Sequence, residues 1–285
     1  MSTTGERGVG RARGLGLVRR GAFLLAAVLT VALLLVATGE VMLFTFTGWT
    51  AAGGEPLGAH RLHVMAIGAV FAALLLTVLS LFVRSSARVA SLWALVATVL
   101  VASWATFVAP ASPGDPVPFL VLAAVLLVAH PAGRGLFRRA DGPSPAILAL
   151  VALAAVPVLA FAVEEVALQS ALGDDHALDG HYGMVVALLT YVLAGGLLAG
   201  LGVAGWRPVA WIAAGLLGFF AVESVAFPAQ ASSVGPTWGA LALAWAVALV
   251  VLAELSRSSE RSPLLRRPSP SADDDGGFEF GARGA

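Results

Sequence analysis

The chain has 285 residues, of which 59% are hydrophobic and 12% are charged, with a mean hydropathy of +0.90 and a formal net charge of zero. So apolar a composition excludes an ordinary soluble domain, and the absence of excess positive charge argues against nucleic-acid binding. The sequence contains no cysteine, which excludes disulfides, thiolate metal sites, iron–sulfur clusters and thiol nucleophiles.

Eight apolar runs follow one another along the chain, and each can cross a bilayer as a helix of about 20 residues. Lipid-facing strands would need alternating polarity and a closed barrel, which the runs lack. We therefore predict an all-α integral membrane protein with eight transmembrane helices, over Gly21–Phe46, Leu62–Val83, Ala87–Ala109, Pro116–Ala132, Pro145–Ser170, Gly180–Val203, Pro208–Pro228 and Pro236–Leu255. The composition of segments 1–20 and 256–285 predicts disordered tails.

The arginines predict the orientation of these helices. All 17 basic residues are arginine, and 16 of them lie in the tails or in the connections that follow even-numbered helices. Arg61 alone falls on the opposite side. The positive-inside rule then places both termini in the cytoplasm, in agreement with an even number of crossings. We predict a multi-pass protein of the cell (inner or cytoplasmic) membrane, with the lipid bilayer as its main partner.

An internal repeat is indicated by residue types that are scarce in this chain. A shift of 118 residues brings four landmarks into coincidence without a gap: His63 with His181, Trp93 with Trp211, Pro110 with Pro228 and Ala111 with Ala229. We predict two four-helix membrane repeats, residues 21–139 and 145–255. Because each repeat makes an even number of crossings, the two should have a parallel orientation.

Most of the unusual polar groups collect on the predicted extracytoplasmic side. Ionisable side chains inside a bilayer are costly, so each is a candidate functional residue. The candidate cofactor-binding residues, which open or occupy the outer parts of predicted helices, are His63, His181, Glu40, Glu164 and Glu165. The alternative set of metal ligands is His60, His63, His176 and His181. Glu164 and Glu165 project about 100° apart on a helix, so at most one should face the bundle interior.

The acidic stretch before His181 has a simpler expected role. Asp174, Asp175 and Asp179 are expected to form a solvated turn, with Asp179 also capping the helix that follows.

Several kinds of chemistry remain open for these groups. Two histidines from facing helices in an apolar setting suit the axial ligation of haem b, which would link the protein to respiratory-chain membrane proteins. Histidines and carboxylates together also suit a divalent metal such as Zn, Cu or Fe. Transport of a small ion or metal is a further alternative, although few polar residues continue into the cytoplasmic half. A purely structural or assembly role is the last. No catalytic residue is predicted, because no nucleophile elbow or comparable motif occurs.

Two segments carry resemblances. "GAHRLHVMAIGAVFAALLLTVLSLFVR" resembles the corresponding segment of the haem A synthase family, whose members have two four-helix halves with haem-ligating histidines. The chain departs from that family at Leu57, where the family has glutamate, in lacking the cysteine-containing loop, and in lacking a second histidine pair in each bundle. "AVEEVALQSALGDDHALDGHYGMVVALL" resembles uncharacterised multi-pass proteins of high-GC prokaryotes, including halophilic archaea. This second resemblance implies a lineage and no activity.

Overall fold

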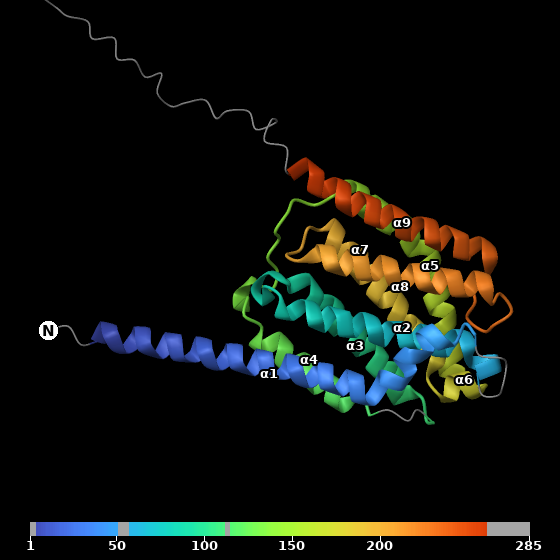
Figure 1. Ribbon diagram of the computed structural model, residues 1–285, viewed down its shortest axis with the longest axis horizontal. Coiled ribbons are helices and arrows are strands. Elements are labelled where there is room, and N and C mark those ends of the chain that lie inside the picture. Colours follow the sequence, from blue (N-terminus) through green and yellow to red (C-terminus); the bar gives the residue numbers. More distant parts are fainter. Residues whose placement is uncertain (1–3, 51–56, 112–114, 261–285) are drawn as a thin grey trace, which may run out of the picture.

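The computed structural model describes residues 4–50, 57–111 and 115–260, which form a bundle of roughly parallel and antiparallel helices (Figure 1). The long helices are α1 (Thr4–Thr47), α2 (Leu57–Phe82), α3 (Val89–Val108), α5 (Pro145–Ala171), α7 (His181–Gly200), α8 (Trp206–Ala226) and α9 (Gly235–Glu260). The shorter α-helices are α4 (Val117–Ala129) and α6 (Asp175–Leu178), and the 3₁₀ turns are η1 (Ser85–Ala87) and η2 (Gly133–Gly135). Each of the seven long helices contains a segment long and apolar enough to cross a membrane. The predicted all-α membrane class is therefore confirmed.

The fourth predicted membrane helix is shorter than expected. Helix α4 has 13 residues, about 20 Å of helix, whereas the hydrocarbon core of a bilayer is about 30 Å thick. Its limits have a local cause. Pro116 caps its start, and His130 at its end precedes Pro131 and has an extended ψ of 132°. A residue before proline is disfavoured in the helical conformation.

The terminal helices extend into the segments that were predicted to be disordered tails. Helix α1 begins at Thr4, and helix α9 continues to Glu260. The N-terminal extension contains Arg, Ala and Leu, and the C-terminal one contains Arg257 and Glu260. All four residue types are good helix formers, so a helix once started can continue beyond the apolar run. The remainder of the predicted C-terminal tail, 261–285, lies outside the described residues.

Helices α2, α3, α7 and α8 occupy the middle of the bundle, and they pack on one another across the two halves of the chain. Helices α1 and α4 flank this middle layer on one side, and α5 and α9 flank it on the other (Figure 1). The start of α1 and the end of α9 lie at the same end of the bundle.

Hydrogen bonds tie three connections together at that end. The amide of Ala90 donates to Ala204 O at 2.9 Å, that of Ala204 to Arg138 O at 3.0 Å, and that of Ala140 to Gly202 O at 2.9 Å. We call this the arginine end, since it holds Arg84, Arg88, Arg138, Arg139 and Arg207. Its connections are residues 83–88, 130–144 and 201–205.

The opposite end joins the start of α2 to the connections 109–111, 172–180 and 227–234. The amide of Ala111 donates to Leu178 O at 3.0 Å, and the Gln230 side chain donates to Gly58 O at 2.9 Å. We call this the histidine end, because four of the five histidines of the chain lie here. Helix α6 marks it in Figure 1.

Candidate metal centre at the histidine end

The four histidines proposed as metal ligands lie together, although they come from three helices. His60 and His63 are on α2, His176 is on α6, and His181 is the first residue of α7. The ring centroids of His60 and His176 are 4.2 Å apart, and those of His63 and His181 are 5.4 Å apart. His176 also lies against His63, with ring centroids separated by 4.7 Å. A compact group of imidazoles therefore stands at the end of the bundle.

The closest potential ligand atoms belong to His60 and His181, whose Nδ1 atoms are 3.2 Å apart. A carboxylate oxygen of Asp179 joins them, and the three ligand atoms all lie within 4.8 Å of one another. All three side chains are partly buried. Zn–N bonds of about 2.0–2.1 Å imply ligand atoms roughly 3.3 Å apart around a tetrahedral ion. The histidine pair already has this spacing, and the Asp179 oxygen lies within 4.8 Å of a ring nitrogen of each histidine.

The sequence-based expectation for Asp179 was wrong on one point. The N-cap of α7 is Gly180, with φ of 84°, so no side chain caps this helix. A left-handed glycine lets the chain turn sharply from α6 into α7, so that Asp179 and His181 flank the turn. Asp174 is the residue that caps, and it does so at α6, where its Oδ1 accepts from the amide of Ala177 at 2.9 Å.

Gln169 of α5 holds this turn in place with two hydrogen bonds. Its side-chain nitrogen donates to Ala177 O at 2.6 Å, and its Oε1 accepts from the amide of Gly183 at 3.0 Å. Gln169 is fully buried, so both bonds are shielded from competing water. The histidine-bearing segments α6 and α7 are thus held to α5 by one side chain that the sequence analysis did not single out.

His63 is fully buried and is anchored through one ring nitrogen. Its Nε2 lies 2.7 Å from Ser232 Oγ, and Ser232 Oγ donates to Glu165 Oε2 at 2.7 Å. Nδ1 of His63 has no hydrogen-bond partner among the described residues. Ser232 was missed in the sequence, because a serine in a connection 169 residues from His63 carries no signal of its own.

His176 is oriented by the backbone and by an acidic neighbour. Its Nε2 lies 3.2 Å from Ala59 O, and its Nδ1 lies 3.8 Å from Asp174 Oδ2. The Tyr182 hydroxyl donates to that same oxygen at 2.6 Å. Partial burial raises the pKa of Asp174, but the hydrogen bonds from Tyr182 and the Ala177 amide, with nearby His176, outweigh it and leave the pKa below its ordinary value.

The three glutamates proposed for the site divide as follows. Glu165 is buried and reaches the histidines through Ser232, whereas its neighbour Glu164 is exposed. The expectation that only one of the pair faces inward is confirmed. Glu40 is exposed on α1 and is not among the side chains that meet at the histidines. Glu223 of α8, outside the proposed set, is fully buried, and neither carboxylate oxygen has a partner among the described residues.

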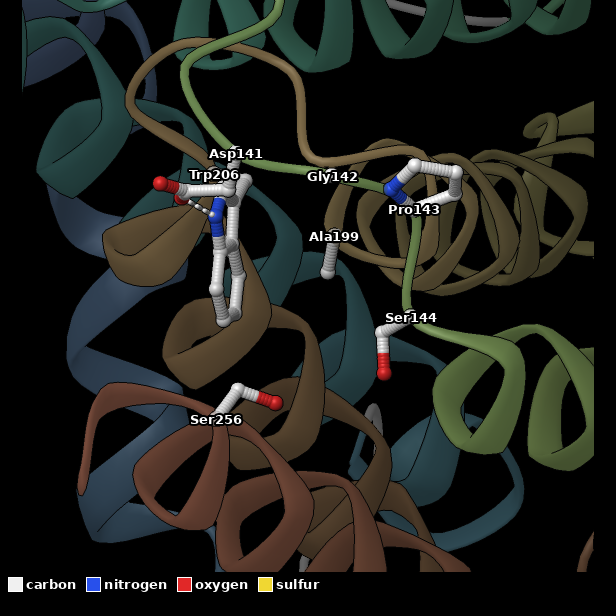
Figure 2. Close-up of a pocket in the computed structure, with 7 residues that line it drawn as sticks. All are labelled: Asp141, Gly142, Pro143, Ser144, Ala199, Trp206 and Ser256. Carbon is white, nitrogen blue, oxygen red and sulfur yellow. Dashed lines mark hydrogen bonds between the residues drawn. The ribbon is translucent and has the colours of Figure 1, made fainter. Parts of the chain in front are cut away.

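A separate hollow of about 260 Å³ lies at the arginine end (Figure 2). Its polar side chains are engaged within the protein. Trp206 Nε1 donates to Asp141 Oδ2 at 2.7 Å, as the dashed line in Figure 2 marks, and Ser256 Oγ donates to Leu252 O at 2.8 Å. Ser144 caps α5. Because these polar groups already bond within the protein, few are available to a ligand, and the histidine end is the stronger candidate site.

Comparison of the chain with protein-family models, with curated proteins and with solved structures finds no match.

Proposed function

We propose that this protein is a multi-pass membrane protein that binds one divalent transition-metal ion at the histidine end. The observation that carries the proposal is the approach of one ring nitrogen each from His60 and His181 and one oxygen of Asp179 to within 4.8 Å of one another. Imidazole and carboxylate donors suit Zn²⁺, Cu²⁺ or Ni²⁺, whereas Mg²⁺ and Ca²⁺ prefer oxygen alone.

The packing of the imidazoles favours a bare ion over haem. Two imidazoles on one tetrahedral ion have ring centroids roughly 5 Å apart, given a Zn–N distance of about 2.0–2.1 Å. The His60–His181 and His63–His181 centroid distances, 5.1 Å and 5.4 Å, are close to this value. A haem between His63 and His181 would need a macrocycle in the space where His60 and His176 pack.

We further propose eight membrane crossings built as two parallel repeats. In support, helices α2 and α7 end at Phe82 and Gly200, and helices α3 and α8 end at Val108 and Ala226. Both pairs of helix ends are separated by the 118 residues that relate the sequence landmarks. Helix α4 would then be the crossing equivalent to α9, shortened by its flanking prolines.

A pair of tryptophan hydrogen bonds supports the same relation. Trp93 Nε1 donates to Leu136 O at 2.8 Å, and Trp211 Nε1 donates to Glu254 Oε1 at 3.1 Å. The two donor residues are 118 positions apart in the sequence, and so are the two acceptor residues. In the two halves, tryptophans at matched positions thus donate to residues at matched positions, to a backbone carbonyl in the first half and to a carboxylate in the second.

The arginines support a cytoplasmic location for the arginine end, and with it for both termini, by the positive-inside rule. The metal site would then face the extracytoplasmic side of the cell membrane, and the lipid bilayer would surround the exposed apolar faces of the helices. An ion could reach the site without passing the hydrocarbon core.

The test is metal binding by purified protein in mild detergent. After treatment with a chelator and dialysis, Zn²⁺ is titrated in competition with a chromogenic chelator, and elemental analysis gives the stoichiometry. We expect one ion per chain in the wild type and none in the double variant His60→Ala/His181→Ala. His130→Gln changes the histidine at the arginine end and should bind like the wild type. A wild type that binds no ion, or a double variant that binds as well as the wild type, would overturn the proposal, and a Soret band would favour haem instead.

A further inference from the structure

The hydrogen bonds around His63 determine which of its ring nitrogens carries the hydrogen. A serine hydroxyl has one hydrogen to donate, and Ser232 donates it to Glu165 Oε2 at 2.7 Å. While Glu165 is an ionised carboxylate, Ser232 Oγ can only accept at its 2.7 Å contact with His63, so Nε2 of His63 is the donor. A neutral His63 therefore has its lone pair on Nδ1.

That lone pair is buried without a partner. His63 is fully buried, and its Nδ1 makes no hydrogen bond to any described residue. A buried polar atom left unpaired costs free energy, so a metal ion bound at this lone pair would stabilise the protein. The rings that surround His63 are those of His176 on α6 and of His181 and Tyr182 on α7. Protonation of Nδ1 would place a cation among other imidazoles.

His63 lies beside the closest group of donors, which is His60, Asp179 and His181, without belonging to it. Its ring centroid is 5.4 Å from that of His181, close to the roughly 5 Å expected for two imidazoles on one ion. Nε2 of His176 likewise donates, because it faces a carbonyl oxygen, Ala59 O, whereas its Nδ1 faces Asp174 Oδ2 at 3.8 Å.

We propose that His63 is a further ligand of the metal ion through Nδ1, and that Ser232 and Glu165 are positioning residues that hold it in the required tautomer. This inference rests on the proposed metal site and deepens it. A ligating histidine commonly donates its other N–H to a carboxylate or carbonyl group, which fixes the ring and raises its basicity. Here Ser232 lies between the two groups and links His63 to the Glu165 carboxylate through two hydrogen bonds. His63 adds a third imidazole nitrogen to the proposed ligands. This ligand set suits an ion that prefers imidazole, such as Zn²⁺ or Cu²⁺.

The first experiment removes the serine hydroxyl without straining the chain. Ser232 has φ of 62°, a left-handed conformation that glycine adopts readily, so Ser232→Gly should preserve the backbone. We expect Zn²⁺ affinity to fall about 10- to 100-fold, the range typical of supporting residues around a metal. The adjacent Ser233, whose hydroxyl donates to Ser224 O at 3.1 Å, gives the matched control. Ser233→Ala should bind Zn²⁺ like the wild type.

A second experiment reads the tautomer and the ligand count directly. In ¹⁵N NMR spectra of histidine-labelled protein, the wild-type His63 should show a protonated Nε2, and Ser232→Gly should give a mixture of tautomers. X-ray absorption of the Zn²⁺-loaded protein should count one imidazole fewer in His63→Ala. If the wild type and both variants bind Zn²⁺ equally, with equal imidazole counts, this inference fails while the metal site stands. If the wild type binds no ion, both fail.

Discussion

The Nδ1 atoms of His60 and His181 lie 3.2 Å apart across 121 residues of sequence. Two neutral imidazoles can hold this distance with one hydrogen between them, and a metal ion can replace that hydrogen with two coordinate bonds. The same geometry therefore serves as a structural contact and would provide half of the proposed metal site. The hydrogen that joins the two rings then moves to Nε2 of its own ring, so both neutral imidazoles can bind the ion through Nδ1.

Asp179 should matter more to metal binding than its acidic neighbour Asp175. Asp179 belongs to the closest group of three donors, whereas Asp175 is exposed in the first turn of α6. Asp179→Asn removes the only negative charge of that group, and we expect Zn²⁺ affinity to fall at least about tenfold. Asp175→Asn should leave affinity within about twofold of the wild type, as competition titrations can measure. Equal losses in the two variants would show that general negative charge, and not ligation by Asp179, attracts the ion.

The proposed orientation can be tested with single cysteines, because the natural chain contains none. Ser86 is exposed at the arginine end, and Asp175 is exposed at the histidine end. In intact cells, a membrane-impermeant maleimide should label Asp175→Cys and leave Ser86→Cys unlabelled until the membrane is opened. Labelling in the reverse order would contradict the positive-inside assignment.

Close packing of α3 against α7 should make Gly183 sensitive to substitution. A Cβ at Gly183 would overlap the Ala105 side chain, whereas a Cβ at Gly215 meets no atom within 4 Å. We expect Gly183→Ala to lower the free energy of unfolding by about 1–3 kcal/mol, the usual cost of overpacking. Gly215→Ala should be neutral or stabilising by up to about 1 kcal/mol, because alanine favours the helix. Thermal unfolding in detergent compares the two, and equal midpoints would contradict the packing.

A buried hydroxyl pair links α2 to α7 far from the histidines. Thr77 Oγ1 donates to Ala73 O at 2.7 Å, so Tyr191 must donate in its 2.5 Å contact with Thr77. Tyr191→Phe should cost roughly 0.5–1.5 kcal/mol of unfolding free energy. Thr77→Val should cost more, since it leaves the fully buried Tyr191 hydroxyl unpaired. The double variant should lose less than the sum of both single losses. Strict additivity would mean that the two hydroxyls are not coupled.

Acid should loosen the capped turn at α6. The pKa of Asp174 is lowered in the folded protein, so its interactions stabilise the fold above the unfolded-state pKa of about 3.9 and are lost as pH falls through the lower folded-state value. The effect should be small, because the carboxylate is half exposed. Hydrogen exchange of the Ala177 amide, followed from pH 5 downward, should accelerate in the wild type once allowance is made for intrinsic rates. In Asp174→Asn the protection should not change with pH.

The helical membrane class was predictable from sequence, because hydropathy is a property of consecutive residues and needs no knowledge of partners. The gathering of the histidines at one end also follows from sequence, since alternate connections of a membrane bundle share a side. The length of α4 was overestimated from the sequence. The apolar run extends through both flanking prolines, Pro116 and Pro131, whereas the helix lies between them.

The tertiary structure decided which polar side chains meet. Sequence spacing shows that Glu164 and Glu165 point different ways, but the packing of distant helices selects Glu165 and leaves Glu164 exposed. Glu40 stays outside for the same reason. Asp179 reaches the histidines beside the left-handed Gly180, and Ser232 reaches them with a left-handed backbone of its own. Both lie in connections whose course depends on the helices around them. The sequence by itself thus determined the element types and the end of the bundle at which the histidines gather, and only packing between remote segments determined which polar side chains meet there.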